Sequence, residues 1–166
     1  MSQVSGGGMA AIIGKSAQEV ADILQTNNLD SIDVANYNSI KQIVISGLKE
    51  DVAHSKPIFE AADAKFFPLN VSGAFHSRYM TPARDEFKSF VDQFAFNIPK
   101  IPVIANYTAK PYGQDDVKTN LVEQINHSVK WSDSILYLIQ QGIQDFLEIG
   151  PGNVLTGLVA KIKRNQ

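Results

Sequence analysis

The chain has 166 residues, of which 44% are hydrophobic and 19% are charged, with a formal net charge of −2 and no cysteine. This length suits one ordinary domain or two small lobes with a buried core. The lack of cysteine excludes disulfide frameworks, thiolate zinc sites and a cysteine nucleophile. There is no basic face for DNA or RNA, and no apolar run reaches the roughly 18–20 residues of a membrane span. We therefore expect a cytoplasmic protein that binds neither nucleic acid nor membrane.

The first part of the chain alternates short β-branched runs with amphipathic stretches. Residues 1–8 are small and polar, and we interpret them as a flexible lead-in. Ser16 and Glu19 have the spacing of a capping box, which marks the start of a helix. Pro68 favours an edge position for the strand that contains it. Strands are predicted at 9–13, 32–37, 42–46 and 65–69, and helices at 17–27 and 50–64.

This β-α-β-β-α-β order indicates a ferredoxin-like small lobe over residues 9–70. The same unit occurs in RNA-binding domains, which present stacking aromatic residues on their central strands. The predicted strand at 42–46 has no aromatic and no basic residue, so RNA binding is disfavoured. Asn36 and Asn38 end the predicted second strand, and a position facing a cleft is one possible role for them.

Residues 71–166 alternate predicted helices with predicted strands, so we expect an α/β lobe with mostly parallel strands. Thr81 and Pro82 mark the start of its first helix, in which Phe87, Phe90 and Phe94 form an apolar stripe. The lobe has too few strands for a complete sheet, which indicates part of a larger domain. Strands are predicted at 103–105 and 145–149, with further helices at 117–125, 133–141 and 153–163.

His76 is the residue best placed to carry chemistry. It lies in the short segment 72–77, between a predicted strand and a predicted helix, with small neighbours. Histidine has an unperturbed pKa of about 6.5, so it can take up and release a proton near neutrality. The alternative is a loop histidine with a purely structural role, and we give that interpretation to His54 and His127.

No nucleophile accompanies His76 in this sequence. The Gly-x-Ser-x-Gly turn that exposes a catalytic serine is missing, and Ser77 is too close in sequence to be activated by its neighbour. The three histidines lack the spacing of metal ligands, so no metal site is predicted. The turn at 150–152 opens a helix as a phosphate loop does, but without the Lys-Ser/Thr that such a loop requires, and we favour a tight structural turn.

Several ordered motifs resemble the malonyl-CoA:acyl-carrier-protein transacylases and the acyltransferase domains of polyketide synthases. The resemblance extends over almost the whole chain and corresponds to the C-terminal part of these enzymes. It implies an α/β-hydrolase-like large lobe over residues 71–166. The motifs are MAAIIG at 9–14, NYNS at 36–39, QIVISG at 42–47, GAFHS at 73–77, Gln124 to Trp131, and EIGPGNVLTGL at 148–158.

The resemblance implies a role for His76 in acyl transfer. In such enzymes a serine attacks the thioester of malonyl-CoA, and the malonyl group then moves to the phosphopantetheine thiol of an acyl carrier protein. His76 matches the histidine that serves as general base and general acid. Gln124 matches the residue whose backbone carbonyl orients the imidazole. Malonyl-CoA is a substrate, and no cofactor is expected.

Three further residues match substrate-binding positions of the family. Asn36 and Asn38 match asparagines that line the cleft between the lobes. In polyketide members a phenylalanine before the histidine goes with malonyl rather than methylmalonyl, so Phe75 indicates malonyl. One methyl group is worth about 1–3 kcal/mol in a pocket, so this is a preference.

The family's serine, its oxyanion-hole glutamine and its carboxylate-binding arginine all precede the region that matches Met1. We therefore expect the N-terminal half of the same polypeptide to be a partner of this chain. Alone, the chain should not transfer acyl groups and should be poorly soluble. Two alternatives stay open: a non-catalytic module that binds carrier protein or acyl-CoA, and a thioesterase-like hydrolase. The pathway is fatty acid or polyketide biosynthesis.

Overall fold

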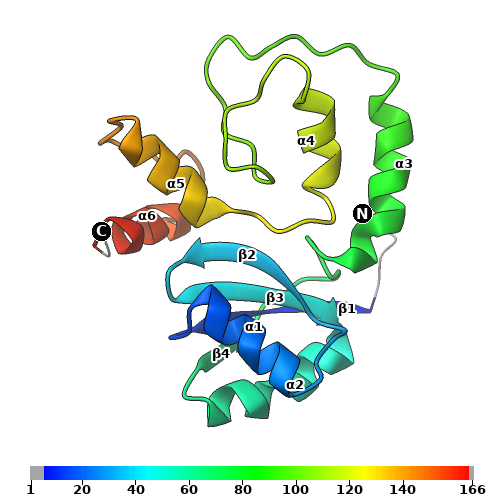
Figure 1. Ribbon diagram of the computed structural model, residues 1–166, viewed down its shortest axis with the longest axis vertical. Coiled ribbons are helices and arrows are strands. Elements are labelled where there is room, and N and C mark those ends of the chain that lie inside the picture. The colour runs from blue at the N-terminus through cyan, green and yellow to red at the C-terminus, as the bar shows by residue number, and fades with distance from the viewer. Residues whose placement is uncertain (1–5, 165–166) are drawn as a thin grey trace.

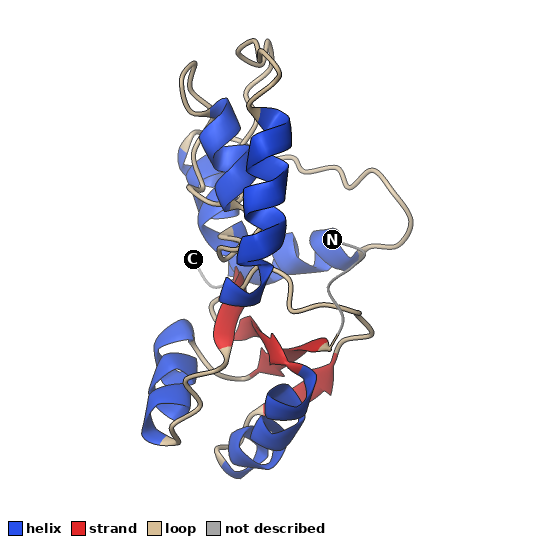
Figure 2. Cartoon of the chain, turned by 90° about the vertical axis from the view of Figure 1, so that its right-hand side faces the viewer, coloured by secondary structure: helices blue, strands red, loops and turns tan. Residues whose placement is uncertain are grey.

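A computed structural model describes residues 6–164 of the chain. Its first part is a four-stranded sheet with two helices on one face, and its remaining helices lie on the other side of the sheet (Figures 1 and 2). None of the helices in this described range combines the length and apolarity needed to cross a bilayer. The elements of the first part are β1 Gly7–Ile13, α1 Ala17–Thr26, β2 Asp33–Ser39, β3 Gln42–Leu48, α2 Lys49–Ala61 and β4 Lys65–Pro68.

The sheet has the strand order β2-β3-β1-β4, and all three pairings are antiparallel. The predicted order of strands and helices is confirmed, and so is the edge position of the strand that ends at Pro68. Strands β2 and β3, which follow each other in the chain, pair directly. The observed strand limits differ from the predicted ones. Gly7 and Gly8 of the predicted lead-in belong to β1, and Asn36 and Asn38 lie inside β2. Residues 1–5 of that lead-in lie outside the described range.

The two faces of the sheet bury different residues, because successive side chains of a strand point to opposite sides. Ala10 and Ile12 of β1 and Ile43 of β3 pack against helices α1 and α2 in the main core. Met9 and Ala11 face the other way and form a smaller cluster on the opposite face. The predicted capping box is present at the start of α1: Glu19 N donates to Ser16 Oγ, and Ser16 N donates to a carboxylate oxygen of Glu19.

Residues 71–164 are helical and irregular. The predicted strands at 103–105 and 145–149 are wrong for this chain: the first is reduced to a single bridge between Ile104 and Pro111, and the second has no strand partner among the described residues. The parallel sheet expected here is therefore not formed within the described part. The elements are a 3₁₀ helix at Arg78–Met80, α3 Thr81–Val91, α4 Val117–Glu123, α5 Trp131–Gln140 and α6 Val154–Arg164.

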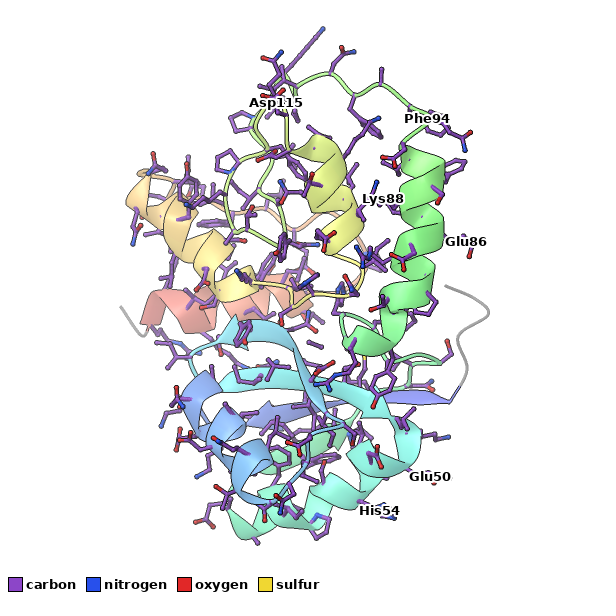
Figure 3. The ribbon with its side chains drawn as sticks, turned by 45° about the vertical axis from the view of Figure 1, so that its right-hand side comes forward. Glu50, His54, Glu86, Lys88, Phe94 and Asp115 are labelled. Carbon is purple, nitrogen blue, oxygen red and sulfur yellow. The ribbon has the colours of Figure 1, made fainter. Side chains whose placement is uncertain are left out.

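Missing neighbours explain why these apolar segments do not form strands. A strand needs a partner for its backbone groups, and a parallel sheet is covered on both faces. Ile101, Leu147 and Ile149 are 76%, 85% and 90% exposed, which is unusual for large aliphatic side chains. Phe90 and Phe94 of the predicted apolar stripe are also exposed, and Figure 3 shows Phe94 at the outer end of α3. The sequence pattern is thus typical of buried strands, whereas these side chains are exposed within residues 6–164.

Helix α6 is held at its start by a carboxylate from the preceding turn. Glu148 accepts hydrogen bonds from the backbone N–H groups of Leu155 and Thr156 and from the Thr156 hydroxyl. The first N–H groups of a helix have no partner within the helix, so an acidic group there is favourable. The Thr156 N–H and hydroxyl bonds lower the pKa of Glu148. The turn at 150–152 therefore serves to bring this side chain back onto the helix, in line with the structural interpretation.

We expect Glu148→Ala to lower the melting temperature at neutral pH. Because the folded-state pKa lies below the ordinary value of 4.5, the stabilisation is fully present above that value and is lost as pH falls through the lowered pKa. The melting temperatures of wild type and variant should therefore converge in acid. Thermal unfolding followed by circular dichroism across this pH range measures the difference. Asp115→Ala is the control, since Asp115 lies exposed at the tip of a loop (Figure 3), and an equal effect of both variants would contradict the account.

Candidate active site

His76 lies in a tight turn between β4 and the 3₁₀ helix. Its φ angle is +58°, in the left-handed region that is uncommon for residues other than glycine but enriched for histidine. The Ser77 hydroxyl donates to the carbonyl of Ala74 over 2.6 Å and accepts from the backbone N–H of Tyr79. Ser77 is almost fully buried, so its hydroxyl is engaged in holding the turn, consistent with the prediction that it is not the nucleophile.

The segment before His76 packs directly on the first residue of β1. A Cβ atom on Gly7 would lie 2.0 Å from the backbone nitrogen of Ala74 and 2.5 Å from the backbone carbon of Gly73. These are backbone atoms, so no side-chain movement relieves the clash. Glycine at position 7 is therefore what allows the sheet and the histidine segment to approach this closely.

The imidazole of His76 is oriented by a backbone carbonyl at the end of α4. Nδ1 lies 2.7 Å from the carbonyl oxygen of Gln124, the residue that caps the helix C-terminus. Carbonyls in the last turn of a helix lack partners within the helix, so this oxygen is free to accept. A carbonyl only accepts, so Nδ1 carries the proton and Nε2 of the neutral ring has a free lone pair. The two predicted residues are brought together, 48 positions apart in sequence.

Two cavities meet at His76. One, of about 780 Å³, lies between α3 and α4 and has an apolar lining that includes Phe87, Phe90, Leu121 and Ile125. The other, of about 690 Å³, has a more polar lining from α1, β2 and the segment at 126–128. Phe75 borders the first cavity beside His76. His76 is half-buried and lines both cavities.

Phe75 packs against the sheet face that α1 and α2 leave open. Its neighbours there are Met9, Ala11, Ala35 and Val44. The small residues Ala11 and Ala35 make room for an aromatic ring against the strands, and the contact anchors the residue that precedes His76. The Phe75 ring thus borders the cavity between α3 and α4 and also packs on the sheet.

Asn36 and Asn38 are half-buried in β2. Asn36 stands opposite Val44 in the register, and Val44 belongs to the cluster that holds Phe75, so Asn36 shares a sheet face with Phe75. Asn38 lies where the register of β2 and β3 is irregular. Neither asparagine borders the two cavities at His76, so the structure brings Phe75, His76 and Gln124 together and places the asparagines further along the sheet.

The segment that follows Gln124 runs along the free edge of β2. Val129 N donates to the Ala35 carbonyl over 2.8 Å, and Tyr37 N donates to the Val129 carbonyl over 2.9 Å. Ser128 Oγ donates to the Val34 carbonyl over 2.6 Å. These bonds form a parallel bridge that fixes the end of α4 relative to the sheet. The histidine segment and the carbonyl that contacts it are thus both anchored to the same sheet.

Three residues at the site were not predicted from sequence. Arg78 forms an ion pair with Asp33 at the start of β2, and this pair raises the pKa of Arg78. His127 Nδ1 lies 2.9 Å from the carbonyl oxygen of Glu123, next to the carbonyl that His76 contacts. Asn106 Nδ2 donates to Gln124 Oε1 over 3.0 Å. Nothing local in the sequence signals the contacts of Arg78 and Asn106, because they join distant segments, whereas His127 and Glu123 are only four residues apart. Within residues 6–164 no cluster of three or more His, Asp or Glu side chains is suited to hold a metal ion.

Residues 1–165 match the family described as "Acyl transferase domain". The chain therefore belongs to the acyl transferase domain family. It is 52% identical over 165 residues to the polyketide biosynthesis malonyl CoA-acyl carrier protein transacylase BaeC of Bacillus velezensis, with 98% of this chain and 57% of the relative covered.

Solved structures show the same similarity. The malonyl CoA-acyl carrier protein transacylase of Burkholderia pseudomallei superimposes with a TM-score of 0.94 at 38% identity, covering 100% of this chain and 59% of that one. A malonyl-transacylase solved in complex with its type II polyketide synthase acyl-carrier protein has a TM-score of 0.90 at 32% identity, covering 97% of this chain and 53% of that one. The chain thus spans somewhat more than half the length of these relatives.

Proposed function

We propose that this chain is the C-terminal part of an acyltransferase that moves malonyl from coenzyme A to the phosphopantetheine thiol of an acyl carrier protein, in polyketide or fatty acid biosynthesis. The observation that carries the proposal is the contact between His76 Nδ1 and the Gln124 carbonyl. It leaves Nε2 as a base beside open cavities, in a chain of the acyl transferase family. The relative BaeC is named as a malonyl CoA-acyl carrier protein transacylase.

The proposed reaction has two transfers. A serine from the N-terminal half of the polypeptide loses its proton to His76 Nε2 as its oxygen attacks the thioester carbon of malonyl-CoA. The carbon–sulfur bond then breaks, and the coenzyme A thiolate takes the proton from His76. In the second transfer His76 takes the proton of the carrier thiol, whose sulfur attacks the malonyl ester, and returns the proton to the serine oxygen.

The Gln124 carbonyl performs the orienting role that a carboxylate performs in a Ser-His-Asp triad. Because it accepts from Nδ1–H, it fixes the tautomer and the direction of the ring. It also stabilises the imidazolium that forms during each transfer, and it lies at the negative end of helix α4. This is a backbone group, so no side-chain substitution at position 124 removes it.

The exposed apolar segments support a partner from the rest of the polypeptide. Leu147 and Ile149 belong to the strand predicted at 145–149, yet they are almost fully exposed here. We infer that strands of the N-terminal half pair with this region and complete an α/β-hydrolase-like large lobe over residues 71–166. The antiparallel sheet of residues 9–70 then serves as a ferredoxin-like small lobe above the cleft. Asn36 and Asn38 would line the cleft between the lobes. An acyl carrier protein would bind at the entrance of this cleft, since a similar transacylase has been solved with its carrier protein.

Replacement of His76 should abolish acyl transfer. We expect His76→Ala in the full-length protein to slow formation of the malonyl-enzyme by about 10²–10⁴-fold, the usual contribution of a general base. Rapid mixing with malonyl-CoA followed by intact-protein mass spectrometry measures the rate. His54→Ala is the matched control, because His54 lies exposed on α2, away from the other lobe (Figure 3).

A His76→Ala protein that forms and transfers the malonyl group at the wild-type rate would overturn the assignment. If the wild type forms the adduct but passes it to water rather than to the carrier thiol, the protein is a hydrolase. If no adduct forms in the wild type, the chain belongs to a binding module.

Phe75 should set the preference for malonyl over methylmalonyl. Its ring is held between the sheet cluster and the cavity at His76, so a smaller side chain leaves room for an α-methyl group. We expect Phe75→Ala to reduce the malonyl preference by about 1–3 kcal/mol, or roughly 10- to 200-fold in the ratio of kcat/KM values. Competition between the two CoA thioesters with product analysis measures this ratio. An unchanged ratio in a folded variant would show that another residue makes the selection.

A further inference from the structure

Asn106 connects three segments that meet beside His76. It lies in the turn closed by the bridge between Ile104 and Pro111. Its side-chain Nδ2 donates to Gln124 Oε1 over 3.0 Å, and its backbone carbonyl accepts from Lys130 N over 2.9 Å. Lys130 follows Val129, which is bonded to β2. Asn106 thus binds the Gln124 side chain through its side-chain amide, and it binds the segment that is bonded to β2 through its backbone carbonyl.

Gln124 needs such a restraint because it lies at the end of a short helix. Its backbone N–H is bonded to the Asn120 carbonyl over 3.2 Å, and its side-chain Nε2 makes only a long contact of 3.4 Å with the Leu121 carbonyl. Helix ends fray, and the peptide plane that carries the Gln124 carbonyl is held to the helix by one bond of 3.2 Å, from Ile125 N to the Val122 carbonyl. The hydrogen bond from Asn106 is the shortest one made by the Gln124 side chain.

We propose that Asn106 is a positioning residue for the His76 imidazole and acts through Gln124. By fixing the Gln124 side chain, it holds the peptide plane whose carbonyl oxygen contacts His76 Nδ1 at 2.7 Å. Small displacements of a reacting group are costly, because proton transfer needs the ring in a near-attack geometry. The inference rests on the proposed function, since it assigns Asn106 a part in the same acyl transfer.

The expected kinetic effect falls on the chemical step. In the full-length protein, Asn106→Ala should lower kcat about tenfold, the size expected for loss of one hydrogen bond, with little change in KM for malonyl-CoA. The variant should also allow a mixture of the two neutral tautomers of His76, because the carbonyl that accepts from Nδ1–H is less firmly placed. Long-range ¹H–¹⁵N correlation spectra of the histidine-labelled protein report this mixture. A role in packing alone would leave the tautomer unchanged.

A double-mutant cycle tests whether the effect passes through Gln124. Gln124→Ala removes the side chain that Asn106 binds and keeps the backbone carbonyl. If Asn106 acts through that side chain, Asn106→Ala should have almost no further effect on kcat in the Gln124→Ala background. Asn106→Leu has nearly the same size and lacks both the donor and the acceptor, so it should behave like Asn106→Ala. Asn97→Ala is the surface control, since Asn97 is exposed and lies on a different segment.

The outcomes separate this inference from the proposed function. If the wild type transfers malonyl, and Asn106→Ala and Asn106→Leu melt normally and keep the wild-type kcat and the wild-type tautomer of His76, the inference is wrong and the proposed function stands. If the two single effects add in the double variant, Asn106 does not act through Gln124 and the inference is again overturned. If the wild type transfers nothing, the proposed function fails and the inference falls with it.

Discussion

The hydrogen bond between His76 Nδ1 and the Gln124 carbonyl is the contact on which the site depends. It joins a turn after the last strand of the sheet to the end of a helix in the second part of the chain. Each partner is anchored separately to the sheet. The histidine segment packs closely on β1 because position 7 is glycine, and the segment after Gln124 is bonded through Val129 to the edge of β2. The sheet therefore acts as a common base that sets the distance between the two groups.

The open face of the sheet gives the small lobe a second role. Helices α1 and α2 cover one face and supply most of the core, which leaves the other face for function (Figure 2). Phe75 lies on that face, against small residues, and Asn36 shares it. The same strands thus pack the main core through one set of side chains and hold Phe75, next to His76, through the alternate set.

The first part of the fold was predictable because its signals are local. The capping box at Ser16 and Glu19, the β-branched run at 42–46 and the proline at the sheet edge each report their own surroundings. The predicted strand at 145–149 is not formed, because strand formation depends on a partner and these residues have none in the described part of the chain. The resemblance implied that the Gln124 carbonyl orients His76, and the two groups are in hydrogen-bond contact, while the roles of Phe75, His76 and Gln124 in acyl transfer stay a prediction. The contacts of Asn106 and Arg78 could not be predicted. Those contacts bring together residues 18 and 45 positions apart that have no motif of their own.

The tautomer of His76 tests the central claim most directly. Long-range ¹H–¹⁵N correlation spectra of the full-length protein, selectively labelled at histidine, report which ring nitrogen carries the proton. Assignment with His76→Ala and a titration from about pH 5 to pH 8 cover the charge change of an ordinary histidine. We predict that the neutral ring is protonated at Nδ1 throughout, because the Gln124 carbonyl can only accept. A neutral His76 protonated at Nε2, or a mixture of both tautomers, would contradict the account.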